Sequence, residues 1–164
     1  MVREISAGGV VIRYGKGGLR MAAIELPVHA TGDPRSNQRV AHRRKRVIAL
    51  PKGLVDPGEP PLETALREVR EETGVTAIPI TKLADIKYVY VRSWGDGERV
   101  FKIVSFYLLR YHSGRINDIV PEMRIEVKRA FWTPLPEAPA LLSYKGERDI
   151  ARLALEYLKS HPAT

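Results

Sequence analysis

The chain has 164 residues, of which 44% are hydrophobic and 28% charged, values typical of a globular protein and not of a disordered or fibrous one. It contains no cysteine, which excludes a disulfide framework, a thiolate metal site and a cysteine nucleophile, and which fits a reducing cytoplasm. Lysine and arginine outnumber aspartate and glutamate, so the formal net charge is +8. Such a charge favours anionic partners: a small phosphorylated substrate, nucleic acid or acidic lipid.

Two apolar strands are predicted at the start of the chain, over residues 5–14 and 19–26, with a glycine-containing turn between them. Gly8 and Gly9 interrupt the first strand, which predicts either a bulge or the close approach of another backbone. The apolar run over residues 5–12 is too short for a secretory signal, and no window reaches the roughly 18 apolar residues of a membrane span. We therefore expect a soluble, cytoplasmic protein with no membrane partner.

A strongly basic segment follows over residues 27–46, with six lysines and arginines between positions 35 and 46. Its glycine, Asp-Pro and Ser-Asn-Gln sequences predict a long loop or insertion and not a core element. A charge run of this kind is most often a solvated loop. Because it precedes a short predicted strand over residues 47–50, two other uses remain open: it could fold over a polyphosphate substrate, or contact RNA or a membrane surface.

A helix is predicted from Pro61 to the glycine at position 74, because proline is tolerated in the first helical turn and glycine commonly follows the last. Its apolar residues recur at helical spacing and predict one buried stripe: Leu62, Ala65, Leu66 and Val69. Three carboxylates are related by i, i+3 and i, i+4, and so converge on a side that we expect to face away from that stripe: Glu68, Glu71 and Glu72.

Crowding three carboxylates near the C-terminal end of a helix is unfavourable, because the charges repel one another and oppose the helix dipole. A hard dication among them would relieve both effects, and Mg²⁺ or Mn²⁺ suits a site made only of oxygen ligands. Glu63, Arg67 and Arg70 share the helix, so local salt bridges are the alternative explanation.

Two long strands are predicted after the helix, over residues 78–91 and 100–111, joined as a hairpin by a Trp-Gly-Asp-Gly turn. Another strand is predicted over residues 127–133, and a final amphipathic helix over 147–159. Strands before and between two helices predict a mixed α/β sandwich, and the absence of repeats and linkers predicts one domain over residues 1–164.

The segment from Gly53 to Val75 resembles the Nudix box: glycine, five residues, glutamate, seven residues, then Arg-Glu-aliphatic-any-Glu-Glu-any-Gly-aliphatic. Every fixed position of that pattern is met, and so many specified residues at fixed spacing make a strong signal. Further segments are similar to the same family: SAGGVVIR and LPKG before the box, and KIVSFYLL and EVKRAFWTPLPEA after it. The chain therefore looks like a member of the Nudix, or MutT-like, pyrophosphohydrolases.

This resemblance implies an α/β/α sandwich with a mixed β-sheet between helices. It also implies a Mg²⁺- or Mn²⁺-dependent activity on nucleoside diphosphates linked to another moiety. Three carboxylates and a main-chain carbonyl are implied as metal ligands: Glu68, Glu71, Glu72 and Gly53. By the same resemblance, Glu59 and Arg67 pair to hold the loop of the box against its helix, so that they position the acids without touching the substrate.

The general base of such a reaction must come within hydrogen-bond reach of the attacking water. Glu71 and Glu72 are candidates for this catalytic role. A glutamate from a later loop often serves in this family, and we choose Glu126, with Glu122 and Glu98 as alternatives.

Two residues are expected to contact the substrate. Lys52 directly precedes the box and could meet a substrate phosphate, with an ordinary exposed lysine as the alternative. Tyr90 follows the box at about the distance where a tyrosine stacks on a base in diadenosine polyphosphate hydrolases, with packing in the strand as the alternative.

The expected function is Mg²⁺-dependent hydrolysis of a phosphoanhydride in a nucleoside polyphosphate, with a diadenosine polyphosphate or a (d)NTP favoured as the substrate. Diphosphoinositol polyphosphate hydrolases share the LPKG sequence, and an RNA 5′ end would also suit a basic protein. A Nudix fold that binds a nucleotide or RNA without turnover is the second hypothesis. Such modules commonly lose acids of the box, whereas this chain keeps all of them.

Overall fold

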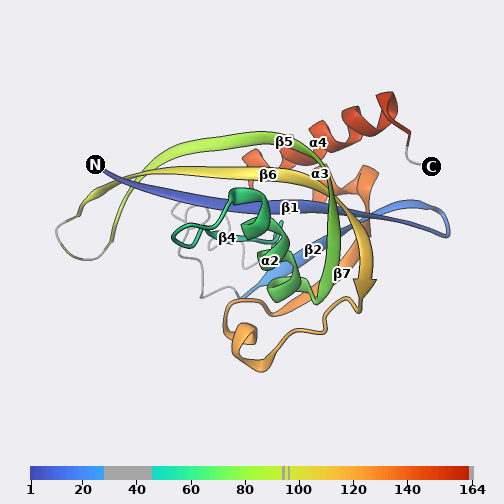
Figure 1. Ribbon diagram of the computed structural model, residues 1–164, viewed down its shortest axis with the longest axis horizontal. Helices are drawn as coiled ribbons and strands as arrows, with labels where there is room; N and C mark the ends of the chain where they lie inside the picture. The colour runs from blue at the N-terminus through green and yellow to red at the C-terminus, as the bar shows by residue number, and fades with distance from the viewer. Residues whose placement is uncertain (28–45, 94, 96, 163–164) are drawn as a thin grey trace.

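The computed structural model describes residues 1–27, 46–93, 95 and 97–162 (Figure 1). In this part of the chain seven strands form one sheet: β1 Val2–Gly15, β2 Gly18–Leu26, β3 Val47–Ala49, β4 Lys52–Leu54, β5 Val75–Val91, β6 Arg99–Gly114 and β7 Arg129–Pro134. The helices are α2 Pro61–Thr73, α3 Ala138–Leu141 and α4 Lys145–Ser160, with 3₁₀ segments η2 Pro121–Ile125 and η3 Leu135–Glu137.

The sheet is mixed, as predicted, with strand order β3-β2-β1-β6-β5. β1 runs parallel to β6, and every other pairing is antiparallel among the described strands. β2 pairs with β1 near their shared turn, with β3 near its own end, and with β7 along residues 20–25. The short β4 lies against β1 opposite residues 6–8.

Helices cover both faces of the sheet (Figure 1), which confirms the predicted α/β/α sandwich. On one face Val10 and Ile12 of β1 belong to the same apolar cluster as Ile150 of α4. On the other face Val11 belongs to the same cluster as Val69 of α2. Because both faces are covered, residues 6–12 of β1 are all buried, the pattern expected of a central strand.

Two features of the sheet differ from the prediction at their edges. β5 begins at Val75, directly after the glycine that ends α2, because three register shifts let the strand continue through its irregular first half. β4 is an additional strand, for which no prediction was made. β5 and β6 pair as predicted, and Trp94 and Asp96 of their turn lie outside the described residues. Residues 28–45 of the basic segment also lie outside the described residues.

Gly8 and Gly9 permit a close approach and do not form a bulge against β6, where β1 pairs in unbroken register. A Cβ at Gly8 would overlap the carbonyl oxygen of Pro51 and the side chain of Lys52. A Cβ at Gly9 would overlap the side chain of Leu109, and the Gly9 N–H donates to the Pro51 carbonyl at 3.1 Å. These glycines therefore let the Pro51–Lys52 corner pack directly on the central strand.

We expect Gly74→Ala to destabilise the protein by more than about 1–2 kcal/mol, the usual cost of the left-handed conformation for an L-residue. Gly74 ends α2 with a φ of 85°, and an added Cβ would lie 2.6 Å from the Arg115 carbonyl oxygen and 2.7 Å from that of Asp118. Gly58→Ala is the matched control, because Gly58 has a φ of 78° with open space around it. Urea unfolding of both variants measures the difference, and equal losses would show that crowding at Gly74 costs nothing.

No helix within the described ranges is both long enough and apolar enough to span a bilayer.

Candidate functional site

Arg67 of α2 joins the loop before the helix to the acids on the helix. Its Nε donates to Glu59 at 2.8 Å, and its Nη2 donates to Glu59 at 2.9 Å and to the Leu54 carbonyl at 3.1 Å. Its Nη1 donates to Glu68 at 2.9 Å and to Glu71 at 3.0 Å. The loop, the helix and two of the three carboxylates predicted as metal ligands therefore meet at one guanidinium group.

Glu59 is held in its charged form by the same contacts. The hydrogen bond from Arg67, followed by that from the Thr64 hydroxyl, lowers the pKa of Glu59 to about 2. The Asp56 N–H also donates to this carboxylate, at 3.2 Å. The structure thus pairs Glu59 with Arg67, in the arrangement that the sequence comparison implied for a positioning pair.

Glu68 lies directly against Gly53 of β4. A Cβ at position 53 would overlap the Glu68 carboxyl group, so only glycine permits this contact. Burial is the main cause that raises the pKa of Glu68 above its usual value, and the charge of Glu71 adds to it, while Arg67 opposes both. The Gly53 main chain and the Glu68 carboxylate are therefore brought together, and their role as two ligands of one ion stays a prediction.

Glu72 is buried, with 8% of its surface exposed, so the prediction that all three acids face away from the core is wrong for this residue. Its Oε1 accepts a hydrogen bond from the Lys52 N–H at 2.9 Å. The β3–β4 corner folds across this side of α2 and covers it, which helical periodicity cannot predict. Burial, and after it the charge of Glu68, raises the pKa of Glu72 to about 8.

Lys52 is bound to a residue that sequence reasoning missed. Its Nζ lies 2.9 Å from Oε2 of Glu147, which is 1% exposed in the first turn of α4. The other oxygen of Glu147 accepts from the Leu50 N–H at 2.7 Å. Burial alone would lower the pKa of Lys52, but the nearby Glu147 carboxylate raises the pKa of this ammonium group above its usual value.

A sequence signal for Glu147 did exist. It lies three residues before Ile150 and seven before Ala154, on the same side of the helix as these buried residues. A glutamate on the apolar stripe of a helix is seldom buried without a partner. The partner, 95 positions earlier in the chain, is visible only in the folded protein.

Glu126 lies at the end of η2 and is exposed. Its negative charge is among the causes that raise the pKa values of Glu68 and Glu72, behind burial in both cases, so Glu126 lies near these acids. Glu122 lies in the first turn of η2, and Glu98, the residue before β6, is paired with Arg92, the residue after β5. Of the three candidate general bases outside α2, Glu126 is the one whose charge is among the main causes that raise the pKa values of Glu68 and Glu72.

Asn117 fixes the segment that leads to Glu126. It adopts a φ of 72°, and its N–H donates to the Thr73 carbonyl at the end of α2 at 2.8 Å. Its side-chain oxygen accepts from the Ala130 N–H of β7 and from Arg124 of η2, both at 2.9 Å. One residue thereby ties η2 to α2 and to the sheet, which explains how an exposed glutamate is held beside the helix.

Tyr90 is not brought to the three acids by its described contacts. Its hydroxyl donates to Glu4 at 2.6 Å, and burial together with this hydrogen bond raises the pKa of Tyr90 to about 12. Glu4 precedes Gly8, the residue opposite Lys52, by four positions, or about 13 Å along an extended strand. Tyr90 therefore lies well along the sheet from the β4 corner, and its contact with a substrate base stays a prediction.

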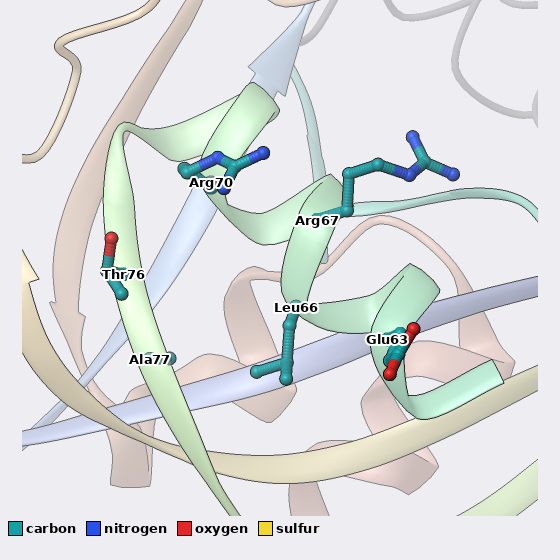
Figure 2. Close-up of a pocket in the computed structure, with 6 residues that line it drawn as sticks. All are labelled: Glu63, Leu66, Arg67, Arg70, Thr76 and Ala77. Carbon is teal, nitrogen blue, oxygen red and sulfur yellow. The ribbon is translucent and has the colours of Figure 1, made fainter. Parts of the chain in front are cut away.

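A cavity of about 270 Å³ lies beside α2, between the helix and the start of β5 (Figure 2). It is lined by Glu63, Leu66, Arg67, Arg70, Thr76 and Ala77. Figure 2 shows Leu66 between the helix and the strand, while the guanidinium end of Arg67 extends away from β5. None of the four predicted metal ligands lines this cavity, so we do not place the chemistry in it.

The donor set suits a hard divalent cation, although its side chains are not yet arranged around one. Glu68, Glu71, Glu72 and the Gly53 carbonyl offer only oxygen, the ligand that Mg²⁺ and Mn²⁺ prefer. Within the described ranges no three histidine or acidic side chains form a ready metal-binding group, and the Arg67 Nη1 lies between Glu68 and Glu71. Burial and mutual repulsion disfavour the charges of Glu68 and Glu72, which is the condition that a bound cation would relieve.

Similarity to known proteins extends over most of the chain. The family model described as a NUDIX domain matches residues 34–154. The Mycobacterium tuberculosis protein named MutT4 is 37% identical over 157 residues, which cover 96% of this chain. The chain spans only 56% of the length of that relative.

Two further matches concern hydrolases of dinucleoside polyphosphates. The asymmetrical bis(5′-nucleosyl)-tetraphosphatase of Mus musculus is 34% identical over 119 residues, covering 69% of this chain and 73% of the mouse protein. The crystal structure of a Caenorhabditis elegans Ap4A hydrolase binary complex superimposes with a TM-score of 0.65 at 20% identity, covering 96% of this chain and 98% of that one. At that identity the structural match shows the fold alone.

Proposed function

This chain belongs to the Nudix family, and we propose that it is a hydrolase that cleaves a phosphoanhydride bond in a nucleoside polyphosphate with the help of Mg²⁺ or Mn²⁺. The observation that carries the proposal is the placement of Glu68 and Glu71 on the Arg67–Glu59 pair, with the Gly53 main chain against Glu68. The third acid, Glu72, lies close enough to Glu68 for the charge of Glu68 to raise its pKa. A complete acidic set in this arrangement is what a metal-assisted hydrolase needs and a simple binding module does not.

The substrate that we favour is a diadenosine polyphosphate or a (d)NTP. The mouse relative named as a bis(5′-nucleosyl)-tetraphosphatase supports the first of these. The net charge of +8 supports any substrate with several phosphates. We expect the protein to act in the cytoplasm, which the absence of cysteine favours.

The cation would be held by the carboxylates of Glu68, Glu71 and Glu72 and by the Gly53 carbonyl. When bound, such an ion neutralises phosphate charge and makes water a better nucleophile for in-line attack. Arg67 would have to release Glu68 and Glu71 in part, while its two hydrogen bonds to Glu59 keep the helix in place.

We assign the remaining roles as proposals. Glu126 would accept the proton of the attacking water as general base, because it is exposed and near the acids of α2. Lys52 would place its positive charge beside the phosphates while Glu147 holds its ammonium group. Tyr90 would stack on a base at the far end of an extended substrate.

The test is a substrate panel in ¹⁸O-labelled water, with Mg²⁺, with Mn²⁺ and with EDTA. The panel contains diadenosine tetraphosphate, (d)NTPs, a diphosphoinositol polyphosphate and triphosphorylated RNA. We expect metal-dependent release of nucleotide products from diadenosine tetraphosphate or a (d)NTP, with the label showing which phosphorus is attacked. If the protein binds RNA but forms no product from any phosphoanhydride, the hydrolase proposal is contradicted and the binding-module hypothesis is supported.

A further inference from the structure

In the described part of the chain, three cations surround one buried carboxylate at the end of β2. Glu25 is 4% exposed and lies 2.8 Å from the Nε of Arg129, 3.5 Å from the Nζ of Lys128 and 3.8 Å from the Nη1 of Arg46. We call these four residues the Glu25 cluster. Arg129 is the first residue of β7, Lys128 is the residue before it, and Arg46 is the residue before β3.

The cluster carries surplus positive charge that faces solvent. Burial alone would raise the pKa of Glu25, but Arg129 and Lys128 lower it, so Glu25 is charged. Its single negative charge does not neutralise the three positive charges of the cluster. The side chains of Lys128, Arg46 and Arg129 are 65%, 57% and 40% exposed, whereas that of Glu25 is 5% exposed. The acid therefore acts as an internal anchor that orients cations which still reach an external ligand.

Arg129 is also held by a ring. Its guanidinium carbon lies 4.4 Å from the centre of the Phe131 ring, and only its Nε bonds to Glu25 among the described contacts. A guanidinium group that is stacked and anchored in this way keeps its other donors in a fixed fork, the geometry that binds phosphate oxygens.

Both chain segments that supply the cations lead directly into the proposed active site. Lys128 is two residues after Glu126, a span of at most about 7 Å, and its N–H donates to the Glu25 carbonyl at 2.8 Å. Arg46 precedes β3, which continues through the Pro51 corner to Lys52. The cluster is therefore connected to the proposed active site through two chain segments, one on the side of Glu126 and one on the side of Lys52.

We propose that Arg46, Lys128 and Arg129 form a subsite for the phosphates of a polyphosphate chain that extend beyond the cleaved bond. This proposal rests on the proposed function and names a reason for the protein to prefer chains of three or more phosphates over diphosphates. The ligand class is a linear polyphosphate ester, because its charges are spaced along a chain that can reach from the acids to the cluster.

The first test measures binding without turnover. Inorganic tripolyphosphate and pyrophosphate are titrated calorimetrically into the metal-free full chain, at two salt concentrations. The variants are Arg46→Gln, Lys128→Gln and their double variant; Arg129 is left intact so that Glu25 keeps its anchor. Lys145→Gln is the control, because Lys145 is 79% exposed on α4 and pairs only with Asp149 among the described ion pairs.

We expect the wild-type chain to bind tripolyphosphate more tightly than pyrophosphate. We expect the double variant to lose about tenfold or more in tripolyphosphate affinity, the loss typical of one charged hydrogen bond, together with part of the salt dependence. Lys145→Gln should bind as the wild type does. Equal tripolyphosphate affinity in the double variant and the control, or no tripolyphosphate binding by the wild type, would overturn the subsite.

A second measurement separates this proposal from the proposed function. With diadenosine tetraphosphate, the double variant should raise KM far more than it lowers kcat. If the double variant turns over this substrate with unchanged KM and binds tripolyphosphate as the wild type does, the hydrolase activity is supported and the subsite is contradicted. If the wild type shows no turnover but the double variant loses tripolyphosphate binding, the subsite is supported and the hydrolase activity is contradicted. If the variants lose affinity for a 5′-hydroxyl RNA oligonucleotide but not for tripolyphosphate, the cluster is a nucleic-acid contact instead.

Discussion

Replacing Glu72 by glutamine should reduce phosphoanhydride hydrolysis by at least about 10²-fold, a loss typical of removing a group that acts on the reacting atoms. The substitution removes a negative charge from the acids of α2 but keeps an oxygen that can accept the Lys52 N–H. Glu71→Gln should have a similar effect. The measurement is the initial rate with the best substrate of the panel at saturating Mg²⁺.

The fold should survive this change. Burial raises the pKa of Glu72 to about 8, so without metal this carboxyl takes up a proton on folding at neutral pH, and that uptake lowers the stability of the folded protein. A neutral glutamine removes that penalty, and we expect urea unfolding in EDTA to show Glu72→Gln to be at least as stable as the wild type. The activity loss would then have a chemical and not a structural cause.

Glu63→Gln is the matched control, because Glu63 is an exposed glutamate in the first turn of the same helix and lines the neighbouring cavity instead. It should retain wild-type activity. If Glu71→Gln or Glu72→Gln turned over substrate at nearly the wild-type rate, the substituted residue would not be catalytic.

Replacing Glu147 by alanine should lower the free energy of unfolding by about 3–5 kcal/mol, the usual effect of removing one partner from a buried ion pair. The change leaves the ammonium group of Lys52 without its carboxylate and the Leu50 N–H without its acceptor. Urea unfolding at neutral pH, in metal-free buffer, measures the loss.

Glu156→Ala is the control on the same helix, because Glu156 is exposed. If Glu147→Ala does not fold, Glu147→Gln keeps an oxygen for Leu50 and should show a smaller, measurable loss. The double variant Lys52→Met with Glu147→Gln should recover part of that loss, because no buried charge remains. Equal stability of Glu147→Ala and Glu156→Ala would show that the pair contributes nothing.

Much of the fold and of the acidic set could be predicted because the evidence for them is local. Pro61 and Gly74 mark the ends of α2, and these signals depend only on backbone chemistry within one turn. The spacing of Glu68, Glu71 and Glu72 places them around one side of a helix in any fold that forms it. The box also identified the family, which the match over residues 34–154 confirms.

Segments that lie far apart in the sequence decided the rest. Periodicity shows which residues share a face, but not which distant segment will cover that face. Glu72 is buried because the β3–β4 corner crosses it, and Lys52 is bound to Glu147 from the other end of the chain. The Glu25 cluster likewise draws its cations from two separate segments. The sequence alone determined the helix, its acids and the family; only tertiary packing decided which charges are buried, paired or left facing solvent, because burial and pairing energies depend on distances that no local pattern contains.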